Sequence, residues 1–169
     1  MLSSFLKRLL LARQADFGPE IKILDLNYSL APLIERIALQ SALKKKFGKK
    51  GLQIIYDSGR QFSISIIKQL KDKFGLNGEE LEKIYFSLVQ TCGFGDIKVI
   101  ELKKAKGIFH AESLVAKHYL AQGVQKEPVD FHLAGMLAGF IQAATGKKVS
   151  CKETACIAQG KTICEFIVK

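Results

Sequence analysis

The sequence contains no tryptophan and only three prolines among its 169 residues, and its glycines are scattered rather than gathered into a linker. It also lacks an uncharged apolar stretch of the ~20 residues that a transmembrane helix needs. Near the start, Lys7 and Arg8 interrupt the apolar residues, so this segment does not read as a secretory signal peptide. We therefore expect one cytoplasmic domain spanning residues 1–169, with no transmembrane segment.

The charge of the chain is strongly positive, with 26 lysines and arginines against 16 acidic residues and a formal net charge of +10. Such a balance favours anionic partners in general. The basic residues nevertheless fall in short clusters beside glycines or at the ends of expected helices, where a cation suits the helix dipole. No known nucleic-acid-binding motif is present, so nucleic acid is not an expected partner and the charge indicates a solvated basic surface.

Signals of catalysis are missing as well. The three histidines, His110, His118 and His132, are far apart and belong to no recognisable triad. The glycines at positions 93 and 95 are too few for a phosphate-binding loop. We predict that the protein is not an enzyme.

Hydrophobic periodicity predicts helices first and strands later. Residues 1–14 read as an amphipathic helix that packs on the body, on a second subunit or on a membrane surface. Further helices are expected over residues 30–47, 52–74, 77–91, 113–122 and 130–144. Strands are expected over residues 20–27, 96–103, 107–112, 148–158 and 162–168. The predicted class is α+β, an antiparallel sheet flanked by helices, with a helical N-terminal half and a C-terminal β-hairpin.

The last predicted hairpin brings two cysteines together. Its turn is centred on Gly160, so Cys156 and Cys164 should face each other with β-carbons roughly 4.5–5.5 Å apart. That separation suits a shared metal ion or a disulfide, and a stable disulfide is not expected in the cytosol. Cys92 and Cys151 have no obvious partner, and we expect them to be packing residues.

Glu153 lies three residues before Cys156, and in a regular strand this spacing directs the two side chains to opposite faces. Both can reach one ion only if a bulge lies between them. Asp130 or His132 could supply a fourth ligand, a mixture that zinc accepts. The alternatives are that the cysteines are small buried apolar residues, that Asp130 is a helix N-cap and that Glu153 is solvated.

Several motifs resemble those of one protein family. They are residues 127–139, residues 146–149, Glu153-x-x-Cys156-x-x-x-Gly160-x-x-x-Cys164-x-Phe166, Tyr56-x-x-Gly59-Arg60 and Leu11-Ala12-Arg13-Gln14. Together they resemble the 4-vinyl reductase (4VR) or hydrocarbon-binding domain family, in its archaeal stand-alone type. The likeness touches most of the chain, and its distinctive part is the C-terminal third.

The resemblance implies an antiparallel sheet flanked by helices, a homodimer and a closed apolar pocket. Relatives of this family include phenol-sensing domains of bacterial transcription activators, and Bet-type subunits of the TRAPP vesicle tether share the fold. In the phenol sensors, a zinc ion is held by a Glu and two Cys that match Glu153, Cys156 and Cys164. Their remaining ligand is a Cys at the place of Asp130, and this departure puts the fourth ligand in doubt.

The helix expected over residues 130–144 has a nearly bare face at Gly135 and Gly139, which lets another backbone approach closely. The chain has eleven phenylalanines, and several lie on elements that would surround the cavity implied by the resemblance. The ligand-binding residues so predicted are Tyr56, Phe62, Phe86, Phe94, Phe109, Met136 and Phe140. For any one of these aromatic residues, ordinary core packing is the alternative.

The leading hypothesis is that the protein binds or senses an apolar small molecule (a hydrocarbon, aromatic or lipid-like compound) and carries a structural zinc ion. The predicted partners are this ligand, a second copy of the chain and a further protein that receives the signal. A second hypothesis is a dimeric assembly module resembling the tether subunits. A third is a zinc enzyme with an open coordination position.

Overall fold

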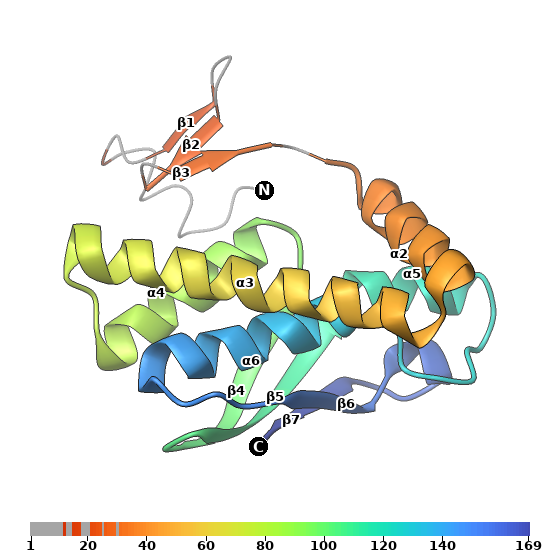
Figure 1. Ribbon diagram of the computed structural model, residues 1–169. Helices are drawn as coiled ribbons and strands as arrows, with labels where there is room; N and C mark the ends of the chain where they lie inside the picture. Colours follow the sequence, from red (N-terminus) through yellow and green to blue (C-terminus); the bar gives the residue numbers. More distant parts are fainter. Residues whose placement is uncertain (1–11, 13–14, 18–20, 25, 30) are drawn as a thin grey trace. The chain divides into compact units, whose positions relative to one another are not determined.

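A computed structural model describes residues 12, 15–17, 21–24, 26–29 and 31–169 (Figure 1). The chain divides into two compact units, Met1–Arg36 and Ile37–Lys169. The first unit contains a three-stranded antiparallel sheet in the order β1-β2-β3, formed by β1 (Ala15–Phe17), β2 (Ile21–Ile23) and β3 (Leu26–Tyr28). Apart from residue 12, the helix expected over residues 1–14 lies outside the described residues.

The prediction of one strand over residues 20–27 is wrong, because β2 and β3 form a tight hairpin in which Ile23 pairs with Leu26. Leu24 lies in the turn with a φ of 52°. Leucine seldom adopts this left-handed conformation, and hairpin turns are usually marked by glycine or asparagine. The sequence therefore carries no usual signal for the turn.

Three helices follow, as predicted: α2 (Leu33–Phe47), α3 (Lys49–Phe74) and α4 (Gly78–Thr91). The helix α2 starts in the first unit and continues into the second. Gly48 and Gly75 both have positive φ angles, and these two glycines separate the three helices. No helix in the described part of the chain is long and apolar enough to cross a membrane.

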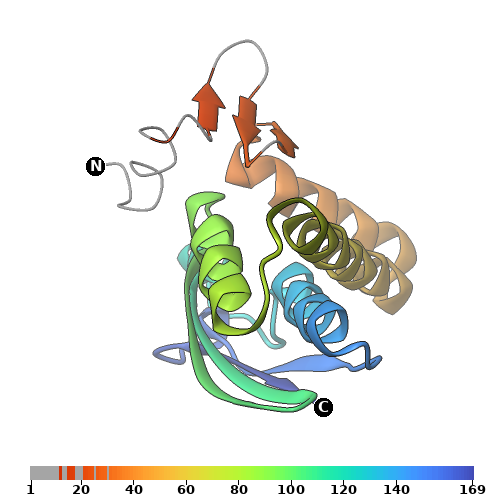
Figure 2. The ribbon, with the colours of Figure 1, turned by 90° about the vertical axis from the view of Figure 1, so that its left-hand side faces the viewer.

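The second unit contains a four-stranded antiparallel sheet in the order β4-β5-β7-β6. Its elements are β4 (Gly95–Lys103), β5 (Lys106–Ser113), α5 (Leu114–Ala121), α6 (Phe131–Thr145), β6 (Cys151–Ala155), the short 3₁₀ helix η1 (Ile157–Gln159) and β7 (Cys164–Val168). The helix α6 lies between α3 and the sheet, and α4 lies beside it on the same face of the sheet (Figure 1 and Figure 2). These elements confirm the predicted α+β class.

The C-terminal hairpin differs from its prediction in one respect that matters for the site. The first strand was expected to continue through residue 158, but β6 ends at Ala155 and η1 follows. The register shifts between Glu153 and Ala155, which is the predicted bulge. Because Ala155 pairs with Glu165, Cys156 comes to lie opposite Cys164, as the turn around Gly160 indicates.

The helices α3 and α6 touch through their backbones. A β-carbon added to Gly135 would lie less than 3.0 Å from the carbonyl group of Tyr56, and one on Gly139 would lie equally close to the carbonyl of Arg60. From the other helix, Gly59 meets the carbonyl of His132 in the same way. The bare face predicted for this helix is confirmed, and the close approach fixes α6 against α3.

Replacing Gly135 with alanine should lower the free energy of unfolding. Alanine gains about 1 kcal/mol in helix propensity. The added methyl group meets a backbone carbonyl that cannot rotate away, so α3 and α6 must separate, and overpacking of this kind costs about 1–3 kcal/mol or more. The control is Ala144→Leu, a larger substitution on an exposed position of α6. Urea denaturation should show destabilisation for Gly135→Ala only; equal stability of the two variants would contradict the packing.

Candidate metal centre and adjoining pocket

Three metal-binding side chains meet at the end of the C-terminal hairpin. Glu153, Cys156 and Cys164 are all buried, and their ligand atoms lie within 4.8 Å of one another. Glu153 comes from β6, Cys156 follows that strand directly and Cys164 begins β7. The bulge after Glu153 turns the carboxylate and the Cys156 thiol toward the same side, so the sequence and the structure agree on these three residues.

Backbone amides surround both sulfur atoms. The N–H of Ile157 donates to Cys164 Sγ over 3.3 Å. A hydrogen bond from the Cys164 thiol lowers the pKa of Cys156 to about 6 against the effect of burial, and the backbone amides of Val129 and Ala158 act in the same direction. The pKa of Cys164 is raised because its thiol keeps the shared proton and is buried. The pair therefore holds one thiolate readily, the state that binds a metal ion.

The carboxyl group of Glu153 is only partly satisfied. Its Oε2 accepts the backbone N–H of Asp130 over 3.0 Å, whereas Oε1 is buried without a hydrogen-bond partner among the described nitrogen and oxygen atoms. Burial raises the pKa of Glu153 to about 9, and the nearby charge of Asp130 adds to this effect. A buried carboxylate oxygen of this kind needs either a proton or a cation. Two thiols and this oxygen fit a metal ion.

Asp130 begins α6 and also contacts the start of α5. Its Oδ1 accepts the N–H of Leu133 over 3.2 Å, and its Oδ2 accepts the hydroxyl of Ser113 over 2.5 Å. Ser113 in turn accepts the N–H of Ala116, which caps α5. The N-cap alternative for Asp130 is confirmed. Its carboxylate is not a member of the three-residue metal group, so its role as a fourth ligand stays a prediction.

His132, the other candidate for a fourth ligand, lies among aromatic rings. Its imidazole stacks on Phe94 with ring centroids 5.5 Å apart and an interplanar angle of 12°. The ring of Phe62 lies 6.4 Å away. His132 is also outside the three-residue group, and we assign it no ligand role.

A pocket of about 730 Å³ adjoins the metal group, between α3, the start of α6 and β6. Its lining residues are Lys49, Leu52, Gln53, Tyr56, Arg60, Glu127, Pro128, Asp130, Phe131, Ala134, Ser150, Cys151, Lys152 and Glu153. This volume is within the range of small-molecule sites. Because Glu153 and Asp130 line the pocket, one of its walls is also the metal group and its support.

Tyr56 is the member of the predicted ligand-binding set that lines this pocket. Its hydroxyl oxygen accepts the N–H of Cys151 over 2.9 Å. Since β6 is an edge strand, this bond satisfies a backbone group that no neighbouring strand reaches. Burial raises the pKa of Tyr56, so its hydroxyl stays protonated at neutral pH.

The other predicted ligand-binding residues lie in the interior. Phe86, Phe109 and Phe140 form one group with Tyr85, with ring centroids 5.0 to 5.9 Å apart. Phe62 and Phe94 form a second group with His132. Met136 is completely buried in α6. These contacts are those of a packed core, and a ligand-binding role for these six residues stays a prediction.

The basic lining of the pocket was missed from the sequence. Lys49 and Arg60 stand on one face of α3 with Tyr56, at intervals of seven and four residues. Such spacing places side chains on the same side of a helix, so the stripe could have been found by periodicity. Lys152 comes from β6, and no local pattern connects it with α3.

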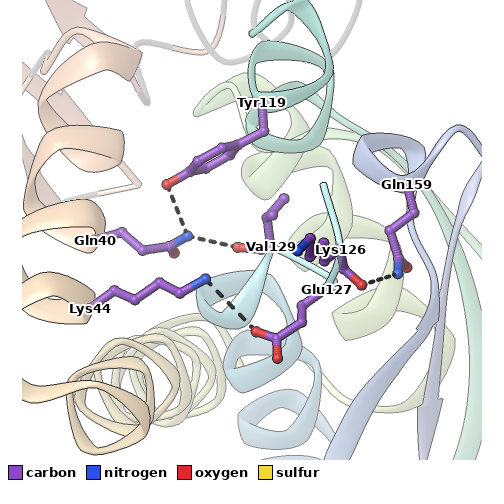
Figure 3. Close-up of polar contacts among 7 residues, drawn as sticks. All are labelled: Gln40, Lys44, Tyr119, Lys126, Glu127, Val129 and Gln159. Carbon is purple, nitrogen blue, oxygen red and sulfur yellow. Dashed lines mark hydrogen bonds and ion pairs between the residues drawn. The ribbon is translucent and has the colours of Figure 1, made fainter. Parts of the chain in front are cut away.

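The loop before α6 is held from three sides (Figure 3). Gln40 of α2 donates to the carbonyl of Val129 over 2.8 Å, and Gln159 of η1 donates to the carbonyl of Lys126 over 3.2 Å. Lys44 pairs with Glu127 at 3.8 Å. These contacts border a second pocket of about 790 Å³, and they fix the loop that carries Asp130 into place.

Comparisons with known proteins agree with this architecture. Residues 111–169 match the vinyl-4-reductase (4VR) domain family. The uncharacterized protein MJ1460 of Methanocaldococcus jannaschii is 35% identical over 116 residues, which are 68% of this chain and 64% of that protein. The chain thus spans less than two thirds of the length of this relative. The predicted resemblance is confirmed, and the chain belongs to the vinyl-4-reductase domain family.

Three solved structures share the fold at low sequence identity. The phenol-responsive sensory domain of the transcription activator PoxR, bound to phenol, gives a TM-score of 0.81 at 19% identity, covering 99% of this chain and 90% of that one. A trafficking protein particle complex subunit 3 from Naegleria fowleri, covalently bound to palmitic acid, gives 0.58 at 14%, covering 80% and 90%. A vinyl-4-reductase family protein from M. jannaschii gives 0.51 at 22%, covering 84% and 98%.

The raised pKa of Glu153 predicts a pH-dependent stability in protein stripped of metal with a chelator. The unfolded carboxyl ionises near its ordinary value of 4.5 and the folded one near 9, so ionisation stabilises the unfolded state across this interval. Relative to Glu153→Gln, the wild type should lose up to about 1.4 kcal/mol of unfolding free energy per pH unit between about pH 5 and pH 8.

The control for this measurement is Glu112→Gln. Lys117 lowers the pKa of the exposed Glu112, so this carboxyl is already ionised in both folded and unfolded protein above about pH 5. The stability difference between this variant and the wild type should therefore be flat over the same interval. A flat difference for Glu153→Gln as well would show that Glu153 is not buried as described.

Proposed function

We propose that this protein, a member of the vinyl-4-reductase domain family, binds or senses an apolar small molecule and does not act as an enzyme. The fold shared with a phenol-responsive sensory domain and the pocket beside α3, α6 and β6 support this function. The apolar part of the pocket surface comes from Leu52, Pro128, Phe131 and Ala134, with a few polar groups around it.

The observation that carries the proposal is that the pocket and the metal group share a wall. Glu153 lines the pocket and belongs to the metal group, and Asp130 lines the pocket and binds Glu153 through its backbone. An ion held by Glu153, Cys156 and Cys164 would join the end of β6 to the start of β7. This wall would then keep its shape whether or not a ligand is present.

Zinc is the ion that these donors suit best. Thiolate and carboxylate ligands at a buried site are typical of structural zinc, and the low pKa of Cys156 supplies a thiolate near neutral pH. When bound, zinc would stabilise the negative charges of the three side chains. Asp130 is the proposed fourth ligand, and it would have to exchange a present hydrogen bond for the metal.

A second candidate function is a dimeric assembly module. Leu39 and Phe47 of α2 and Ile54 of α3 expose about half of their surface, at 56%, 47% and 51%. Exposed apolar residues of this size are common at protein interfaces. A homodimer is also part of the leading proposal, so the retained ligand, and not the subunit count, separates the two functions.

Native mass spectrometry of freshly purified protein, followed by denaturation and organic extraction, tests the proposed function. We expect a dimer that carries one zinc ion per chain and releases an apolar compound on extraction. A protein that retains no such compound and also takes up no hydrophobic dye would contradict small-molecule binding and favour the assembly module.

Metal content can be assigned to residues by substitution. Cys156→Ser combined with Cys164→Ser should abolish zinc binding, measured by elemental analysis of purified protein, because both thiolates are lost. The matched control is Cys92→Ser, which removes a thiol at the end of α4. Retention of full zinc by the double variant, or its loss from Cys92→Ser, would contradict the assignment.

Asp130→Asn tests the fourth ligand. Asparagine caps helices as well as aspartate does, so α6 should form normally. If Asp130 binds the ion, zinc affinity measured by competition with a chelator should fall by at least about tenfold. An unchanged affinity would remove Asp130 from the ligand set and leave the other three residues in place.

A further inference from the structure

Three cations line the pocket between α3, α6 and β6: Lys49, Arg60 and Lys152. In the part of the chain that the structure describes, no ion pair joins any of them to an acidic residue. The guanidinium of Arg60 is held by Gln142, whose Oε1 accepts from Nε over 2.8 Å and also from Nη2. Gln142 is neutral, so it orients Arg60 without cancelling its charge.

The acidic residues of the same pocket are occupied elsewhere. Glu127 pairs with Lys44 of α2 (Figure 3). Asp130 accepts hydrogen bonds from Ser113 and from the start of α6. Glu153 accepts the N–H of Asp130 and belongs to the metal group. The positive charge of the pocket is therefore left for a bound molecule.

The hydroxyl of Tyr56 adds a directed donor. Its oxygen accepts the N–H of Cys151, which leaves the O–H proton for an acceptor in the pocket. Tyr56 stands between Lys49 and Arg60 along α3, so the three polar groups share one wall. Hydrogen bonds in which one partner is charged are about twice as strong as neutral ones, so an anion gains more here than an alcohol.

We infer that this pocket selects an amphipathic anion, an apolar body that carries a carboxylate or similar head group. The head would contact Tyr56, Arg60 and the two lysines, and the body would lie against Leu52 and Phe131. This inference rests on the proposed function, and it adds the charge of the ligand to it. A purely neutral hydrocarbon would leave the three cations without a counter-charge.

A matched pair of probes tests the charge. Decanoate and decan-1-ol have the same chain and differ in the head group. In isothermal titration calorimetry with the full-length, zinc-loaded protein, decanoate should bind roughly tenfold more tightly than the alcohol, an advantage of about 1.4 kcal/mol. Raising the salt concentration should reduce this preference, because the lysines are exposed.

Substitutions connect the preference to the pocket. Lys49→Met and Lys152→Met should each weaken decanoate binding by roughly two- to fivefold, as expected for exposed charge pairs, and leave decan-1-ol binding unchanged. Both positions are exposed, so the fold should be preserved. The control is Lys148→Met, an exposed lysine that does not line the pocket.

The outcomes separate the inference from the function. If neither probe binds, small-molecule binding itself is contradicted and the inference is overturned with it. If decan-1-ol binds as tightly as decanoate, the proposed function stands and the charge selection is overturned. A decanoate preference that survives the combined Lys49→Met and Lys152→Met substitutions would also overturn it.

Discussion

The structure of the larger unit depends on the contact between the backbones of α3 and α6. Gly135 and Gly139 leave room for the carbonyl groups of Tyr56 and Arg60, so the two helices approach more closely than helices with side chains at these positions can. The same two residues, Tyr56 and Arg60, line the pocket. The glycines therefore set the position of the pocket wall as well as the packing of the core.

Asp130 transmits this position to the C-terminal hairpin. It starts α6, accepts a hydrogen bond from Ser113 just before α5, and donates its backbone N–H to Glu153. Through these bonds, the metal group, two helices and the pocket are parts of one buried network. The loop that precedes Asp130 is held by Gln40 and Gln159, so the network begins from a fixed backbone. Buried polar networks that are nearly satisfied resist rearrangement, and Glu153 Oε1 is the atom that a bound ion would complete.

Much of this arrangement could be predicted from the sequence, because it follows from local rules. The spacing around Gly160 placed Cys156 opposite Cys164, and the three-residue interval to Glu153 required the bulge that the structure contains. The hairpin at Leu24 could not be predicted, because its turn lacks the usual residues and the apolar alternation continues through it. The basic wall of the pocket was missed for a different reason. Periodicity shows which residues share a face of α3, but only the tertiary fold brings Lys152 of β6 to that face.

The central claim is that the metal group braces a ligand-binding wall, so zinc and ligand should bind cooperatively. By linkage, an ion that stabilises the wall must raise the affinity for a ligand that uses it, and the ligand must raise the affinity for zinc by the same factor. The most direct measurement is the dissociation constant of decanoate for the same protein with zinc and after zinc removal. We predict that removal of zinc weakens binding at least about fivefold, the lower end of typical coupling between sites. Equal dissociation constants for a zinc-loaded and a folded, zinc-free protein would contradict the account.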